Sequence, residues 1–276
     1  MTEEQDTPSN EQKQKPVSEE VQNDSVTEAA ETKNKTMEVH HHPDVEKKNL
    51  KGYILEGLMI FLAVTMGFIA ENIREQITEH KTAKILAQSM LEDIKKDTAS
   101  LHMVIAFSYQ KLSAADSIIA ILHSPRDKWN DTNFYKYLGP IMTSYPFIST
   151  DGTYAQMKTS GTLRYFNQSL VNQMNAYDVQ LKKTEYRDNV EDKGIWIIGT
   201  FNFDIINIEV MTDLRFNNPI THEMYIKFAD KAMIDKFINL VTINKSFSSR
   251  SRMEYQEQLK IADKLIEALK KEYNLD

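Results

Sequence analysis

One apolar run, residues 52–70, limits the possible folds of this chain more strongly than any other part of it. As an α-helix it covers about 28 Å, which is close to the hydrocarbon thickness of a bilayer. Its one ionisable residue, Glu56, lies about one turn inside the N-terminal edge, where a side chain can reach the interface. Tyr53 stands where interfacial aromatic residues are found. We therefore expect one transmembrane helix over residues 52–70, in contact with the lipid bilayer.

Three other structures fit this run to different degrees. A cleaved signal peptide is disfavoured, because about fifty residues of acidic chain would precede it and Phe68 would stand at the −3 position, where a small residue is needed. An interfacial helix is disfavoured because no polar face runs along the segment. A buried helix of a soluble protein stays an alternative, because the part after Gly57, residues 58–70, has only thirteen residues.

The charges beside the run predict its orientation. Lys47, Lys48 and Lys51 crowd its N-terminal edge, whereas Arg74 is the one cation among the first ten residues after Ala70. Because positive residues are enriched in cytoplasmic flanks, we expect a cytoplasmic N-terminus and a C-terminal domain on the other side of the membrane.

Small residues within the run suggest a contact between helices. Ala63 and Gly67 lie four positions apart, so they share one helix face. Such a pair lets two membrane helices approach closely. Helix association through Ala63 and Gly67, and with it a homo-oligomer, is therefore one expectation.

The segment before the run differs sharply in composition. Residues 1–46 hold twelve Asp or Glu and four Lys or Arg, and they contain no Phe, Tyr or Trp. Such a segment buries too little apolar surface to offset its ordering entropy, so we expect a disordered acidic tail. The whole chain carries −7 and the tail −8, which leaves +1 for the rest and gives no sign of nucleic-acid binding. Adjacent His40, His41 and His42 form no preorganised metal site, and no cofactor is expected.

The remaining chain, residues 71–276, has the pattern of a helical soluble domain. Apolar residues recur at steps of three, four and seven up to Pro125, which predicts that the membrane helix continues into a first long helix. Short helices are expected from Asp131 to Gly139-Pro140 and around Tyr154 to Gly161. Two further long helices are expected, one capped by Asn167 and one from about Asp230 to Tyr273. These elements predict an all-α fold in which one transmembrane helix runs into an elongated antiparallel bundle.

One stretch of this domain is ambiguous. Residues 195–210 are rich in Ile and Phe, which suits either a continued helix or a pair of strands. We favour the helix, because no tight hairpin signal divides the stretch.

Two stretches resemble a known family. The anchor over residues 53–64 and 67–75, and the later stretch over residues 151–164 with Asn167 and Leu170, are similar in order and spacing to uncharacterised single-pass membrane proteins of Bacteroidota, which carry a domain of unknown function. The resemblance implies an inner-membrane protein of the Gram-negative cell envelope with a helical periplasmic domain. It implies no activity.

The strongest local candidate for ligand binding is the segment containing Tyr154, Lys158 and Arg164. Two cations near the turn at Gly161 could bind a carboxylate or phosphate group. The simpler interpretation is a helix stop at Gly161 with Tyr154 packed inward and the two cations in solvent.

No phosphate loop, dinucleotide glycine pattern, nucleophile elbow or zinc-protease motif occurs, so we expect no enzyme. Two functions fit better. The first is an interaction or scaffold protein that binds a protein partner or its own copy. The second is a ligand-sensing module that passes a helix movement through the membrane to a cytoplasmic partner.

Overall fold

The computed structural model describes residues 49–276, so the predicted tail at residues 1–46, with its three histidines, lies outside the described residues. The described part is mainly helical, and its one β feature is an isolated bridge between Ile206 and Ile226. This confirms the all-α prediction. The helices are α1 (Leu50–His123), η1 (Arg126–Lys128), α2 (Asp131–Ile141), α3 (Gly152–Ser160), η2 (Thr162–Tyr165), α4 (Gln168–Asn202), α5 (Ile208–Phe216) and α6 (Lys231–Tyr273).

Helix α1 is continuous from the apolar run to His123, two residues before Pro125, as the sequence predicts. An apolar window of eighteen residues within it has a mean hydropathy of 2.0, and none of that window is buried. Phe61 is 65% exposed and Phe68 is 73% exposed. A core helix of a soluble protein would bury such side chains. Helix α1 is therefore long and apolar enough to cross a membrane, and the window is not a core helix of this chain.

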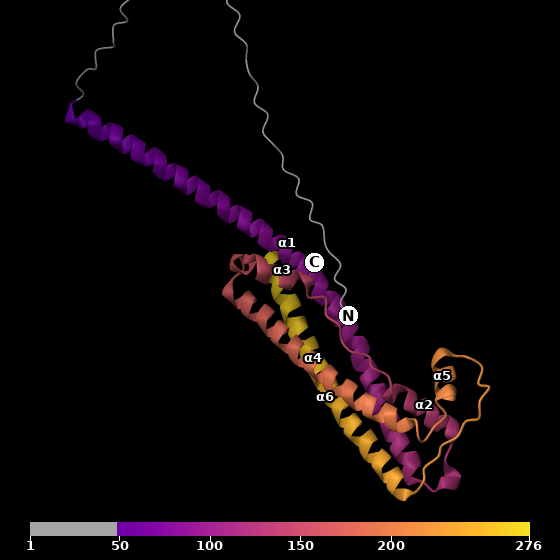
Figure 1. Ribbon diagram of the computed structural model, residues 1–276. Coiled ribbons are helices and arrows are strands. Elements are labelled where there is room, and N and C mark those ends of the chain that lie inside the picture. The colour runs from indigo at the N-terminus through magenta and orange to yellow at the C-terminus, as the bar shows by residue number, and fades with distance from the viewer. Residues whose placement is uncertain (1–48) are drawn as a thin grey trace, which may run out of the picture. The chain divides into compact units, whose positions relative to one another are not determined.

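The packed part of the chain lies within residues 60–276, where α4 and α6 run side by side along the later part of α1 (Figure 1). Helices α4 and α6 are antiparallel. Gln180 of α4 contacts Glu254 of α6, and the later residue Glu191 contacts the earlier residue Ser248. Helices α1 and α4 run in the same direction, since Asp97 meets Tyr177 and, further along both helices, Lys111 meets Glu191.

Three apolar clusters fill the bundle. One holds Ala87, Ile94 and Met174 with the end of α6, and another holds Phe134, Ile118 and Phe237 with α2 and the start of α6. A small third cluster around Leu101, with Phe147 and Leu181, lies apart from these. Each fully buried Leu, Ile or Phe side chain contributes about 1.5–3 kcal/mol, so the two larger clusters supply most of the stability.

Side-chain caps begin the long helices where the sequence predicts them. Asn167 accepts a hydrogen bond from Leu170 N at 2.8 Å, and Asp230 accepts one from Met233 N at 2.8 Å. Gly161 adopts φ 71° and ends α3 in the left-handed conformation. At α2 the cap is Asn130, one residue before the predicted Asp131, because its Oδ1 accepts from Asn133 N. Such caps are worth about 1 kcal/mol each.

The ambiguous stretch, residues 195–210, is helix at both ends with a break between. Helix α4 ends at Asn202 and α5 begins at Ile208, a short helix absent from the sequence prediction. The break is held in place from outside the stretch, because Lys227 N donates to Ile205 O at 2.8 Å and Tyr135 accepts from Asn207 N at 2.7 Å. Tertiary hydrogen bonds thus replace those of a continuous helix.

A non-helical segment at residues 142–151, the strap, connects α2 to α3. The strap runs back along the bundle, which lets α1 and α4 point the same way (Figure 1). An extended segment among helices has no ladder partner, so its backbone N–H groups need side-chain acceptors. Two of these groups, Phe147 N and Thr150 N, donate to carboxylates of the long helices.

Candidate functional site

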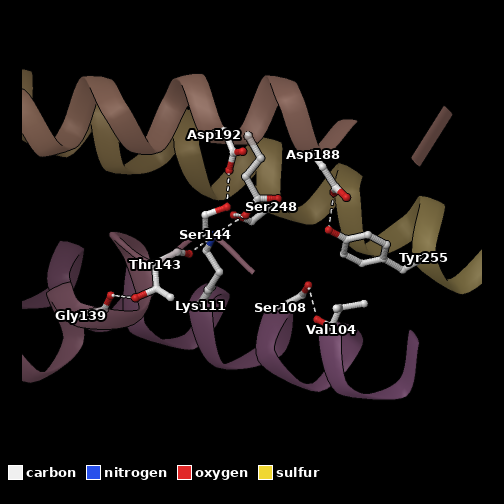
Figure 2. Close-up of polar contacts among 11 residues, drawn as sticks. Val104, Ser108, Lys111, Gly139, Thr143, Ser144, Asp188, Asp192, Ser248 and Tyr255 are labelled. Atoms are coloured by element: carbon white, nitrogen blue, oxygen red, sulfur yellow. Dashed lines mark hydrogen bonds and ion pairs between the residues drawn. The ribbon is translucent and has the colours of Figure 1, made fainter. Parts of the chain in front are cut away.

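Polar side chains occupy core positions of all three long helices around one point. This charged cluster consists of Lys111 on α1, Asp188 and Glu191 on α4, and Ser248 and Tyr255 on α6; each residue is at most 8% exposed. Figure 2 shows Lys111 reaching from α1 towards the strap, with Asp188 directed at Tyr255. Buried charges are stable only when paired and hydrogen-bonded, so the contacts of each decide what the cluster does.

Lys111 forms the centre of the cluster. Its ammonium group forms an ion pair with the carboxylate of Glu191 and donates to the carbonyl oxygen of Thr143, in the strap, at 3.2 Å. Glu191 also accepts a hydrogen bond from Ser248 Oγ at 2.8 Å. Lys111 therefore ties α1 to α4 and to the strap, and Glu191 extends the connection to α6.

Asp188 holds the next part of the strap. One of its oxygens accepts from the hydroxyl of Tyr255 and the other from Phe147 N at 3.2 Å. Burial raises the pKa of Asp188 to about 6, although the hydrogen bonds from Tyr255 and Phe147 act in the opposite direction. The nearby carboxylates of Glu191 and Asp192 raise it further.

A second carboxylate, Asp97 of α1, also binds one backbone N–H group of the strap and one tyrosine hydroxyl. Asp97, 1% exposed, accepts from Thr150 N at 2.7 Å and from the hydroxyl of Tyr177 at 2.6 Å. Burial is also the main cause that raises the pKa of Asp97. Asp93 accepts from Thr153 N at 3.3 Å, at the start of α3. Carboxylates spaced along the bundle thus accept hydrogen bonds from two backbone N–H groups of the strap and from one at the start of α3.

The space beside the cluster is too small for a substrate. A cavity bordered by Lys111, Ser144, Asp188 and Tyr255 has a volume of about 10 Å³, room for about one water molecule. Within residues 49–276, no group of three or more His, Asp or Glu side chains is placed to hold a metal ion. The geometry is therefore that of a clamp, which fixes the strap and the register of the three helices.

One candidate membrane helix and a bundle tied by buried charges together characterise this molecule. No protein-family model, curated protein or solved structure matches the chain.

The sequence-predicted ligand residues lie at α3 and η2. The ammonium group of Lys158 stands 4.8 Å above the Tyr154 ring and 3.4 Å from Asp178, whereas Arg164 lies 5.1 Å above the ring of Tyr165. The structure thus brings Tyr154 and Lys158 together and gives Arg164 a different aromatic partner. Ligand binding by Tyr154, Lys158 and Arg164 stays a prediction.

Asp178 is the acidic partner of Lys158 at this place. Burial alone would raise its pKa, but the hydrogen bond from Lys182 and the charges of Lys158 and Lys182 outweigh burial and lower it. Lys158 therefore already faces an ionised carboxylate. An incoming anion would compete with Asp178 for it.

Ala63 and Gly67 lie in the exposed part of α1. A Cβ built on Gly67 meets no atom within 4 Å, so this face is open in the single chain. That leaves room for a second helix, and association through Ala63 and Gly67 stays a prediction.

Sequence reasoning missed the charged cluster. The missing signal was spacing: Thr184, Asp188 and Glu191 continue the three-and-four steps of the α4 core that begin at Leu170 and Tyr177. Assigning core positions by helical spacing, whatever the residue type, would have identified Asp188 and Glu191 as buried.

Proposed function

We propose that the chain is a single-pass protein of the bacterial inner membrane whose helical domain acts as an interaction or scaffold protein in the periplasm. The observation that carries the proposal is the exposed apolar window of α1, with mean hydropathy 2.0 and no buried residue. In water such a surface would drive aggregation, and in a bilayer it is the favoured state.

Two features of the sequence support the proposed orientation and compartment: the charges beside the apolar window and the resemblance of the anchor. Lys47, Lys48 and Lys51 precede the window, and the positive-inside tendency places that edge in the cytoplasm. The resemblance of the anchor to Bacteroidota envelope proteins supports the same arrangement, with the C-terminal domain in the periplasm.

The closed charged cluster supports binding through surfaces rather than turnover of a substrate at that point. Its cavity admits about one water. The partner in this proposal is an unknown protein or a second copy of the chain, and the role includes no catalytic step.

A sensing role is the second candidate, and one observation favours it. The same uninterrupted helix, α1, contains the apolar window and both Asp97 and Lys111, which hold the strap. A ligand that released the strap would change the packing of α1, and a rigid helix can carry a displacement along its axis.

Membrane placement is tested by fractionation of cells expressing the full-length chain. We expect the protein in the membrane pellet after washing with alkaline carbonate and its release by detergent. Protein released by carbonate alone would contradict the transmembrane proposal.

Orientation is tested with engineered cysteines, because the chain contains none. Ser18→Cys lies in the tail and Ser246→Cys at an exposed position of α6. In intact spheroplasts a membrane-impermeant maleimide should label only Ser246→Cys, and lysis should expose both. The reverse pattern would overturn the orientation.

The scaffold and sensing roles predict different binding partners for the protein, and binding through different parts of the chain. Crosslinking in cells, detergent extraction and mass spectrometry should recover a constant partner, or a second copy of the chain, through the periplasmic domain. Recovery through the cytoplasmic segment alone would favour the sensing role instead.

A further inference from the structure

A large cleft lies between α2 and α5; it is bordered by Thr143, the strap residue that also binds Lys111 of the charged cluster, and it shares no residue with the Tyr154 segment. Its volume is about 590 Å³, within the range of about 300–1,000 Å³ typical of small-molecule sites. Its walls carry Met142 from the start of the strap, directly after α2, and Ile208, Met211 and Leu214 from α5. The lining is thus mainly apolar and partly made of flexible methionines, which adapt to ligands of irregular shape.

The charged side chains that line this cleft are all positive. Lys136 of α2 and Arg215 of α5 are its only charged members. Within residues 49–276, neither forms an ion pair with a carboxylate. Arg215 donates to Thr143 Oγ1 at 3.5 Å, a long contact that leaves most of its N–H donors available. Two cations beside an apolar surface complement a molecule with an anionic head and an apolar body.

The walls of the cleft are held before any ligand arrives. Tyr135, 1% exposed, donates to Tyr225 O at 2.9 Å and accepts from Asn207 N at 2.7 Å, immediately before α5. Asn207 in turn caps α5 through Glu209 N at 3.0 Å. One buried hydroxyl therefore fixes α5 relative to α2, and a preformed site avoids the entropy of ordering on binding.

We propose that the cleft between α2 and α5 binds a single-chain anionic amphiphile, with its alkyl chain on Met142, Met211 and Leu214 and its carboxylate or phosphate between Lys136 and Arg215. This ligand site goes beyond the proposed interaction role. The two proposals can fail independently. The ligand proposal concerns the α2–α5 cleft, whereas the interaction role concerns the α1 window and the partners of the domain.

The test is photolabelling of the full-length protein in phosphatidylcholine nanodiscs with a diazirine-bearing dodecanoate, followed by peptide mass spectrometry. We expect adducts within residues 131–143 and 203–215. Excess unlabelled dodecanoate or dodecyl phosphate should remove them, and which of the two competes better identifies the head group. Dodecyltrimethylammonium, of equal chain length and opposite charge, should not compete.

Two variants and a matched control locate the effect. Lys136→Gln with Arg215→Gln should reduce adduct yield about tenfold, because two partly exposed charge-assisted contacts are lost. Thr212→Trp should block the cleft and reduce labelling equally. Lys183→Gln with Arg250→Gln removes two exposed cations from α4 and α6 and should leave labelling unchanged. Circular dichroism checks that each variant is folded.

Three results would overturn the proposal. The first is labelling confined to residues 52–70, and the second is equal competition by the cationic amphiphile. The third is unchanged labelling when both Lys136 and Arg215 are replaced in a folded protein.

Discussion

Lys111 on α1 and Glu191 on α4 form an ion pair in which only 5% and 10% of the two side-chain surfaces are exposed. Removing two charges from water is unfavourable, so such a pair stabilises the fold only when further hydrogen bonds complete it. Here Thr143 O and Ser248 Oγ do so. Only one helix register satisfies both charges, so we expect the pair to select that register as well as to join α1 to α4.

Breaking this pair from one side should be severe. Lys111→Met leaves the Glu191 carboxylate buried without its cation, which typically destabilises a protein by about 3–5 kcal/mol. Urea unfolding of the full-length protein in mild detergent measures the loss. The double variant Lys111→Met with Glu191→Leu should be closer to wild type than the single variant. Equal or greater loss in the double variant would show that the pair itself supplies net stability.

The raised pKa of Asp188 predicts a pH dependence of stability. Its folded pKa is about 6, and an unfolded Asp has a pKa of about 3.9. Between these values the folded protein holds a proton that the unfolded chain has lost. The stabilising contribution is therefore complete below about pH 4 and disappears as pH rises through about 6.

Asp188→Asn tests this dependence, because it removes the titrating group and keeps one acceptor for Tyr255. Across the window from pH 4 to 7, the difference in unfolding free energy between wild type and variant should change by on the order of 2 kcal/mol, with wild type favoured more at the acidic end. A difference that stays flat across the window would contradict the shift. Taking the difference removes the contribution of Asp97, whose pKa is also raised.

Gly194 sets the separation of α4 and α6. A Cβ there would stand 2.9 Å from Phe247 Cδ2 and 3.0 Å from Asn244 Nδ2, so Gly194→Ala should force the helices apart and destabilise by about 1–3 kcal/mol. Gly199→Ala is the matched control on the same helix, because its nearest neighbour is Met142 Cε at 3.9 Å. That control should be neutral or stabilising by up to about 1 kcal/mol. Thermal unfolding followed by circular dichroism separates the two, and equal effects would exclude a close-approach role.

Helix association through Ala63 and Gly67 is testable in the membrane. Gly67→Leu should lower the dimer fraction, measured by crosslinking of full-length protein in vesicles, because the larger side chain separates the two backbones. Gly57→Leu changes the same residue type elsewhere in the run and should leave the dimer unaffected. Dimers that persist in Gly67→Leu would remove this face as the contact.

Much of the fold was predictable from local signals. The long first helix ends before Pro125, Asn167 and Asp230 cap the other long helices, and Gly161 ends α3, all as the sequence predicts. These signals are local because a cap, a proline or a left-handed glycine acts within one turn.

The residues that face the core were less predictable. In the middle of the bundle several apolar residues are exposed, and several core positions hold polar residues. Tyr109, Ile243 and Met253 suit an apolar stripe, yet each is more than half exposed. The core positions there belong to Lys111, Ser248 and other polar side chains. Polar residues can occupy core positions only when partners elsewhere in the chain satisfy them, and those partners cannot be read from one helix alone.

The sequence by itself determined the three long helices and the apolar window of α1, because each depends on residues within a few turns of one another. Tertiary structure alone decided the course of the strap, the pairing of Lys111 with Glu191 and the cleft between α2 and α5. Each of these joins side chains tens of residues apart. Their energy depends on distance and exclusion of water, which exist only once the three long helices have packed.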